Sequence, residues 1–257
     1  MSTENLMADT HLYILTGASR GMGLAMAQQL LAPGHTLLCI SRKENAALAA
    51  QAAQAGCKLE QWPLDLAHSR EAAAMLRQWL GRPGVRHAGA TLINNAGMIP
   101  RIAPLSDMDP DDLAQALRVG LEAPMALCAA FLAATEGWGV PRRILNISSG
   151  LGRRPMASQA VYCAAKAGMD HYTRCLALEE AHKPKGAQVC SLAPGVIDTD
   201  MQVQLRGADA AAFPDRARFE QLKNGGQLDS PEAAARKVLA YLNRPDFGSE
   251  PVADVRA

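Results

Sequence analysis

The sequence carries almost no net charge. Its 257 residues include 26 Lys and Arg against 25 Asp and Glu, which gives a formal charge of +1. Binding nucleic acid or an anionic membrane surface through phosphate groups requires a broad excess of positive charge. The composition therefore argues against a nucleic-acid partner.

Paired cysteines and metal-ligand clusters are also missing. The six cysteines are scattered without a CxxC pair, and the six histidines form no group at metal-ligand spacing. We expect reduced thiols, most of them buried, and no bound metal.

Targeting segments and long apolar runs are lacking too. The N-terminal MSTENLMADTH is polar and acidic where a signal peptide needs a basic start and an apolar stretch. No apolar run reaches the ~18 to 20 residues of a membrane span. We expect a cytoplasmic protein without a membrane segment, and a flexible end at residues 1–10.

The chain does show a regular alternation of short aliphatic runs and Ala/Leu-rich stretches. The short runs predict buried strands at 12–16, 36–40, 59–64, 91–94, 144–148 and 189–193. The longer stretches predict helices at 22–31, 44–55, 69–80, 110–135, 158–181 and 231–242. Strands that are apolar throughout need helices on both faces, so we expect an α/β fold with a doubly wound parallel sheet.

No repeat or linker divides the chain, so a single domain covering residues 1–257 is expected. Ser69 and Ser230 are placed to cap the helices that follow them. Residues 199–226 break the alternation with several glycines and a proline. Because loops of this length are uncommon unless they cover a site, we predict a small helical flap there.

A glycine-rich turn joins the first predicted strand to its helix. Residues 16–23 read TGASRGMG, with Gly17, Gly21 and Gly23 at GxxxGxG spacing. Glycine allows the tight bend and lets backbone N–H groups approach a phosphate at the helix N-terminus. Three glycines alone are equally compatible with a plain strand-to-helix turn. Between a strand and a helix they predict a dinucleotide site.

Cations surround the predicted phosphate site. Ser41-Arg42-Lys43 follows the second strand, where an acid would bind the ribose of NAD and a base would accommodate the extra phosphate of NADP. Arg20 adds a second guanidinium that can bind the same phosphate. We therefore expect NADP(H). The alternative is that both arginines are solvated surface charges. Asp65 is either an acceptor for the adenine amino group or a cap of the next helix.

A tyrosine and a lysine stand four residues apart in a predicted helix. Tyr162 and Lys166 therefore share one helix face, where the ammonium can lower the phenol pKa. A decrease of ~2 to 3 units requires roughly 3 to 4 kcal/mol. Ser149, at a strand end, can hold a substrate oxygen near the phenol. The set predicts carbonyl reduction, although such a pair alone is often an ordinary surface contact.

Taken together, these motifs resemble the short-chain dehydrogenases/reductases over residues 12 to about 200. The shared features are TGASRGMG, NNAG at 94–97, the Ser149, Tyr162 and Lys166 set, and Pro194-Gly195. The resemblance implies a Rossmann fold with seven strands in the order 3-2-1-4-5-6-7, the last near 251–253. It also implies a homodimer or homotetramer built on helices 110–135 and 158–181.

The resemblance also implies roles for individual residues. Ser149, Tyr162 and Lys166 match the catalytic residues, with Tyr162 as the general acid in reduction. With the residues already discussed, the expected cofactor contacts are Gly17, Ser19, Arg20, Gly21, Met22, Gly23, Ser41, Arg42, Asp65, Leu66, Asn95, Ala96, Gly97, Tyr162, Lys166, Pro194, Gly195, Ile197 and Thr199.

One position departs from the family pattern. The family places an asparagine in the helix after NNAG, where this chain has Gly120. In the family this asparagine helps to hold a water chain from the lysine to solvent. The space left by glycine can hold an ordered water, so we hypothesise a reduced or rerouted proton relay. The alternative is an NADP-binding sensor or scaffold with little or no catalysis.

The C-terminal third resembles sepiapterin reductase and the bacterial reductases of diketones such as benzil, in LALEE at 176–180, DTDMQ at 198–202 and LKxxGxL at 222–228. In sepiapterin reductase an aspartate near the C-terminus anchors the pterin. Asp254 is either its counterpart or a solvated charge. Met156, Gln159, Met201 and Phe213 form either an adaptable apolar wall or ordinary core. The expected substrate contacts are Ser149, Met156, Gln159, Tyr162, Met201 and Asp254. The substrate expected is a small ketone or vicinal dicarbonyl.

Overall fold

The computed structural model describes residues 10–82 and 87–256. Seven parallel strands form one sheet in the order β3-β2-β1-β4-β5-β6-β7, which confirms the order implied by the resemblance. The strands are β1 His11–Thr16, β2 His35–Ser41, β3 Lys58–Pro63, β4 Gly89–Asn94, β5 Arg142–Ile147, β6 Gln188–Ala193 and β7 Val252–Asp254. All six strands predicted from the sequence are present, with small shifts at their ends.

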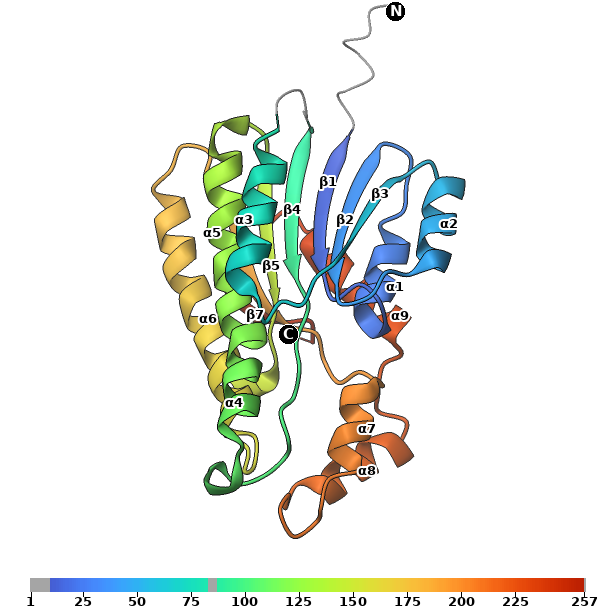
Figure 1. Ribbon diagram of the computed structural model, residues 1–257, viewed down its shortest axis with the longest axis vertical. Helices are drawn as coiled ribbons and strands as arrows, with labels where there is room; N and C mark the ends of the chain where they lie inside the picture. Colours follow the sequence, from blue (N-terminus) through green and yellow to red (C-terminus); the bar gives the residue numbers. More distant parts are fainter. Residues whose placement is uncertain (1–9, 83–86, 257) are drawn as a thin grey trace, which may run out of the picture.

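Helices cover both faces of the sheet (Figure 1). They are α1 Gly21–Gln29, α2 Ala46–Gln54, α3 Ser69–Leu80, α4 Pro110–Leu117, α5 Ala123–Thr135, α6 Ala160–Ala181, α7 Asp200–Arg206, α8 Arg216–Asn224 and α9 Pro231–Leu242. One apolar cluster joins α1 and α9 to the sheet, and a second joins α3 and α5 to its other face. Because both faces are covered, strands such as β1 and β4 are buried at nearly every position, and most of their residues are apolar.

The predicted helix 110–135 is interrupted in its middle. Arg118–Glu122 forms a π-helical turn between α4 and α5. Gly120 is buried in this turn, and a Cβ atom there would lie 3.2 Å from the Cβ of Ala165 on α6. On the side that faces α6, Ala165 therefore occupies the space that was expected to be free at Gly120.

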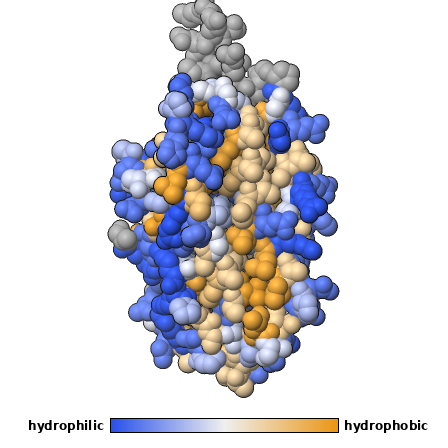
Figure 2. All heavy atoms as spheres, turned by 90° about the vertical axis from the view of Figure 1, so that its left-hand side faces the viewer, coloured by the Kyte–Doolittle hydropathy of each residue, from blue (hydrophilic) through white to orange (hydrophobic). Residues whose placement is uncertain are grey.

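By length and composition alone, the helical segment Pro110–Trp138, with its π-helical turn, could cross a membrane, and its most apolar window has a mean hydropathy of 1.5. Its inner side chains Leu127 and Phe131 are fully buried against the sheet, as in a core helix of a globular protein. Its outer side and that of α6 form the face seen in Figure 2, where an apolar band runs along the molecule. Met125 on α5 and Leu178 on α6 are 46% and 68% exposed.

The segment expected to form a flap contains α7 and α8, which lie beyond the carboxyl ends of the strands (Figure 1). Leu205, Phe213 and Phe219 from this segment form an apolar cluster that includes Tyr162. Gln204 donates to the backbone oxygen of Ile99 over 3.3 Å, which ties the segment to the loop after β4. The flap segment therefore packs directly on the tyrosine of the predicted site.

Candidate active site

Three glycines shape the loop between β1 and α1. Gly17 and Gly21 have φ angles of +71° and +55°, in the left-handed region that favours glycine. A Cβ atom at Gly23 would overlap the carbonyl oxygen of Gly17, and one at Gly17 would lie 2.9 Å from the Cα of Ala96. The loop is thus a compact turn pressed against the NNAG segment.

Polar side chains fix this turn in place. The hydroxyl of Ser41 accepts from the Ala18 backbone N–H over 2.8 Å. Asn95 donates its side-chain amide to the Thr16 and Gly17 carbonyls over 3.0 and 3.2 Å. The Thr16 hydroxyl accepts from the backbone N–H groups of Asn95 and Ala96. Ser41 and Asn95, expected as cofactor contacts, therefore hold the loop itself. Thr16 was missed as a site residue, although it opens the TGASRGMG motif.

The remaining predicted cofactor residues gather around the same turn. A Cβ atom at Gly21 would lie 3.7 Å from Cγ2 of Thr199, and one at Gly97 would lie 3.8 Å from Nζ of Lys166. α1 begins at the turn without an acidic residue in its first turn. The helix dipole and the free backbone N–H groups therefore suit an anion there. The residues present fit a dinucleotide, whose pyrophosphate the glycine loop would hold.

Other members of the predicted set differ in exposure. Met22, Leu66 and Pro194 are buried, whereas Ser19 and Ile197 are partly exposed. Gly195, two residues after β6, has a φ angle of +87°. None of these exposures identifies the ligand.

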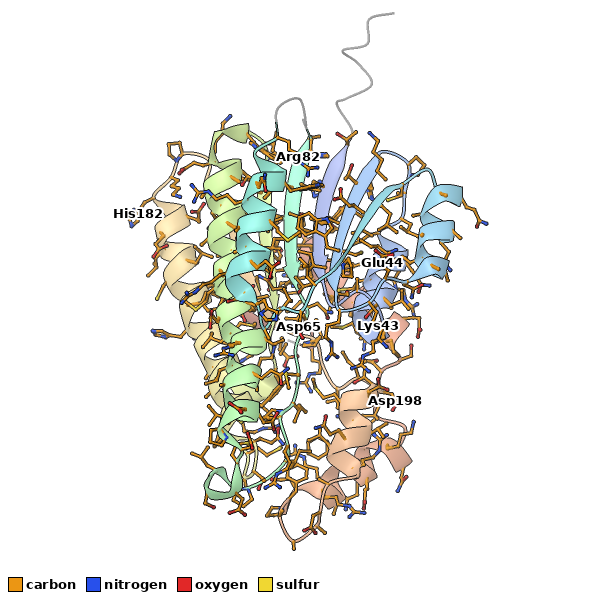
Figure 3. All side chains as sticks on the ribbon, in the orientation of Figure 1. Lys43, Glu44, Asp65, Arg82, His182 and Asp198 are labelled. Carbon is orange, nitrogen blue, oxygen red and sulfur yellow. The ribbon has the colours of Figure 1, made fainter. Side chains whose placement is uncertain are left out.

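Both arginines expected at the extra phosphate are exposed. Arg20 pairs with Asp200 at the start of α7 over 2.6 Å, while Arg42 makes no ion pair within the described part of the chain. The carboxylate of Asp65 accepts from the backbone N–H of Ala67 over 2.9 Å, so it closes the turn before α3. Lys43 and Asp65 both lie toward the carboxyl ends of the strands (Figure 3).

Ser149, Tyr162 and Lys166 converge at the carboxyl end of β5. Ser149 follows that strand, and its hydroxyl accepts from the Leu151 backbone N–H over 3.1 Å. Tyr162 and Lys166 are buried at the start of α6. Lys166 Nζ lies 5.8 Å from the centre of the Tyr162 ring and donates to the Ile147 carbonyl over 2.7 Å.

Burial controls the protonation of this group. It raises the pKa of Tyr162 to about 12, against an opposing hydrogen bond with Ser149. It also lowers the pKa of Lys166 to about 8, against the opposing charge of Asp170. In the chain alone the Tyr162 pKa is not lowered, because loss of hydration outweighs the hydrogen bond with Ser149. The lower pKa expected beside Lys166 and an oxidised nicotinamide stays a prediction. A phenol that keeps its proton has the form required of a general acid.

The comparisons with known proteins identify the family of this chain. The short chain dehydrogenase family model matches residues 11–210. The chain belongs to the short-chain dehydrogenase family. It is therefore an oxidoreductase of that family, with the fold and the motif order found above.

Two curated proteins and one solved structure are similar to this short-chain dehydrogenase over nearly its whole length. The benzil reductase ((S)-benzoin forming) of Bacillus cereus is 34% identical over 235 residues, covering 91% of this chain and 94% of the relative. The sepiapterin reductase of Xenopus tropicalis is 33% identical, covering 93% of each chain. A crystal structure of a putative 2-deoxy-d-gluconate 3-dehydrogenase from Agrobacterium tumefaciens with bound NADP is 26% identical, with a TM-score of 0.78 and coverage of 97% and 96%.

In this short-chain dehydrogenase the predicted substrate residues fall into two groups. Met156 and Met201 pack against the apolar cluster that contains Tyr162. Gln159 is 2% exposed, and within the described residues its side-chain oxygen has no hydrogen-bond partner. Met156 and Met201 therefore share one apolar environment with Tyr162.

Asp254 belongs to the second group. It ends β7 and accepts two hydrogen bonds from the Arg256 guanidinium, over 2.8 and 2.7 Å. This pairing holds the pKa of Asp254 below its ordinary value. The carboxylate is therefore held in β7 and paired, and is not a charge in a frayed tail. Its role as a substrate anchor stays a prediction. Sequence reasoning missed Arg256, whose position two residues further along the chain was the available clue.

Proposed function

We propose that this protein is an NADPH-dependent carbonyl reductase of small ketones or vicinal dicarbonyls, with Tyr162 as the general acid. The observation that carries the proposal is the buried, protonated phenol of Tyr162 beside Ser149 and Lys166. These residues lie at the carboxyl ends of the strands, where the glycine loop also lies. The names of the two curated relatives, a benzil reductase and a sepiapterin reductase, support a dicarbonyl or a pterin side-chain ketone as substrate.

The residues act on the substrate oxygen. The nicotinamide of the bound cofactor supplies the hydride that reaches the carbonyl carbon. Ser149 donates a hydrogen bond to the carbonyl oxygen, and Tyr162 gives that oxygen its proton as negative charge develops there. Lys166 and Ser149 then stabilise the phenolate until solvent returns the proton. The flap segment with α7 and α8 packs with Tyr162 in one apolar cluster and so excludes bulk water from the phenol.

The direct test is a substrate panel. Purified protein is mixed with NADPH or NADH and with benzil, aliphatic diketones, simple ketones and sepiapterin, and cofactor oxidation is followed by absorbance. The proposal expects turnover with NADPH, fastest for vicinal dicarbonyls. Tight NADPH binding without turnover of any carbonyl compound would favour the alternative of a sensor or scaffold, for which Gly120 is the motivating residue.

Arg20 and Arg42 are expected to set the cofactor preference. Charge-assisted hydrogen bonds contribute about 1.5–3 kcal/mol each, so Arg20→Ala or Arg42→Ala is expected to weaken NADP binding about 10- to 100-fold and leave NAD binding nearly unchanged. Calorimetric titration with both nucleotides measures this. Arg82→Ala is the control, because Arg82 lies at the opposite end of the sheet (Figure 3). Equal losses of NAD and NADP affinity would contradict the assignment.

Gly120→Asn is expected to destabilise the fold by about 1–3 kcal/mol, because the new side chain is forced against Ala165. Urea unfolding measures the loss. The second substitution Ala165→Gly, combined with the first, is expected to recover part of it. A Gly120→Asn variant that is fully stable and faster than the natural chain would instead show that the family asparagine fits and that its relay was missing.

We also propose a homodimer or homotetramer that buries the outer faces of α5 and α6. The apolar band in Figure 2, with exposed Met125 and Leu178, supports this surface, because large exposed apolar patches mark association sites. Light scattering on the purified chain and on a Leu178→Glu variant tests it. A monomeric natural chain would exclude the proposal.

A further inference from the structure

Asp170 is a buried charge to which the proposed reaction assigns no role. It lies on α6 one helical turn beyond Lys166 and is 1% exposed. The Ser191 hydroxyl on β6 donates to its Oδ1 over 2.7 Å, and Nε of Arg153 lies 3.3 Å from its Oδ2. Burying a carboxylate is costly unless it is paired and hydrogen-bonded. We therefore asked which neighbouring groups the Asp170 charge acts on.

One effect of Asp170 is on the loop that carries Ser149. Arg153 extends from this loop to Asp170 and also donates to the Ala253 carbonyl over 2.9 Å. A Cβ atom at Gly152 would lie 2.9 Å from Oδ2 of Asp170 and 2.9 Å from the backbone oxygen of Lys166. The loop is therefore in direct contact with α6, and the Arg153–Asp170 pair fixes it there.

A second effect is on Lys166. Its ammonium donates to the Ile147 carbonyl and lies 4.0 Å from the Met169 sulfur, and it has no ion pair within the described residues. Among the described residues, the ionisable groups near it are Tyr162, Cys163 and Asp170 on its own helix, and Arg153, which lies behind Asp170 on the Ser149 loop. The segments of β5 and of the loop after β4 that face it present Ile147 and Gly97, which carry no charge. Asp170 is thus the anion that offsets the burial of Lys166.

We infer that Asp170 is a positioning residue that keeps the Lys166 ammonium charged and the Ser149 loop docked on α6. The inference rests on the proposed function for its catalytic meaning. Asp170 touches neither substrate nor cofactor and acts through Lys166 and Arg153. Through Lys166 the Asp170 carboxylate affects the general acid Tyr162. Through Arg153 it affects the position of Ser149, which binds the substrate oxygen.

The sign of the effect follows from charge. A lysine with a lowered pKa loses its proton as pH rises, and removing the neighbouring anion makes this happen at lower pH. Asp170→Asn is therefore expected to lower the pH at which Lys166 titrates by about one unit. Arg153→Met removes the cation that neutralises Asp170 and is expected to move this titration to higher pH. A purely structural role of Asp170 would move neither.

The experiment is an NMR titration of the free protein with carbon-13-labelled lysine, in which Lys166→Met identifies the Lys166 signal. The expected result is a shift to lower pH in Asp170→Asn and a shift to higher pH in Arg153→Met. Asp246→Asn, which removes an exposed carboxylate paired with Arg244, is the control and is expected to leave Lys166 unchanged. If Asp170→Asn does not fold, the Arg153→Met shift alone decides the outcome. Unchanged Lys166 titration in the variants that fold would overturn the inference.

The pH profile of ketone reduction links the titration to activity. In Asp170→Asn the rate is expected to fall at lower pH than in the natural chain, and to approach the natural rate on the acidic side. Superimposable profiles would overturn the inference while leaving the proposed function standing. An inactive natural chain would overturn the proposed function, and the titration of free Lys166 would still test the role of Asp170.

Discussion

Tyr162→Phe is expected to lower kcat for dicarbonyl reduction by about 10²- to 10⁴-fold. The phenol is the group placed to give a proton to the substrate oxygen, and burial keeps it protonated, with a pKa of about 12. Phenylalanine preserves the ring that packs against the flap cluster, so the fold and NADPH affinity are expected to change little. Initial rates, cofactor titration by fluorescence and thermal unfolding together measure the three quantities.

Tyr172→Phe is the matched control for this variant. Tyr172 lies on the same helix but packs against the apolar cluster beneath α3 and α5. Its hydroxyl lies beside the Cys128 thiol in that cluster, so near-natural activity is expected. If Tyr162→Phe kept more than about a tenth of the natural kcat, the general acid would have to be another group, since such groups contribute at least about 100-fold.

Gly23→Ala is expected to abolish cofactor binding, with an affinity loss above about 100-fold, and to cost about 3 kcal/mol of stability. The new methyl would overlap the Gly17 carbonyl and lie 2.5 Å from the Asn95 side-chain nitrogen. Relief requires the backbone of the turn to move, which displaces the N–H groups that face the pyrophosphate. Urea unfolding and NADPH titration measure the two losses.

Gly137→Ala provides the comparison, because a Cβ atom there would meet nothing within 4 Å. Its stability is expected to stay within about 0.5 kcal/mol of the natural chain. Equal behaviour of Gly23→Ala and Gly137→Ala would show that the turn has room for a side chain, and the account of the phosphate cradle would be wrong.

The central strands could be predicted from the sequence, because a strand buried on both faces consists mostly of apolar residues. β1 and β4 meet that condition, whereas β7 has three half-buried residues, so its presence followed only from the family resemblance. The π-helical turn could not be predicted, because its residues suit an ordinary helix. Its widened turn accompanies the close approach of Ala165 to Gly120, a contact between distant segments.

Polar contacts between residues close in the sequence could be predicted, whereas those between distant segments could not. Ser230 caps α9 as predicted, by accepting from the Ala233 backbone N–H. Ser69 does not cap α3, because its hydroxyl donates to Glu122, which is 53 residues away. The pairing of Arg20 with Asp200 likewise joins segments that no local pattern connects. Spacing along the chain identified the residues of the site, while their partners and protonation depend on burial and tertiary contacts.

The most direct measurement is the fate of the hydride in a single turnover. The protein is mixed with benzil and NADPH in which both hydrogens of the hydride-donating carbon are deuterium, and the product is analysed by mass spectrometry and NMR. The account predicts benzoin with one deuterium, on the carbinol carbon, and one oxidised cofactor per product. Reduced cofactor that remains unconsumed, or a product without the label, would contradict it.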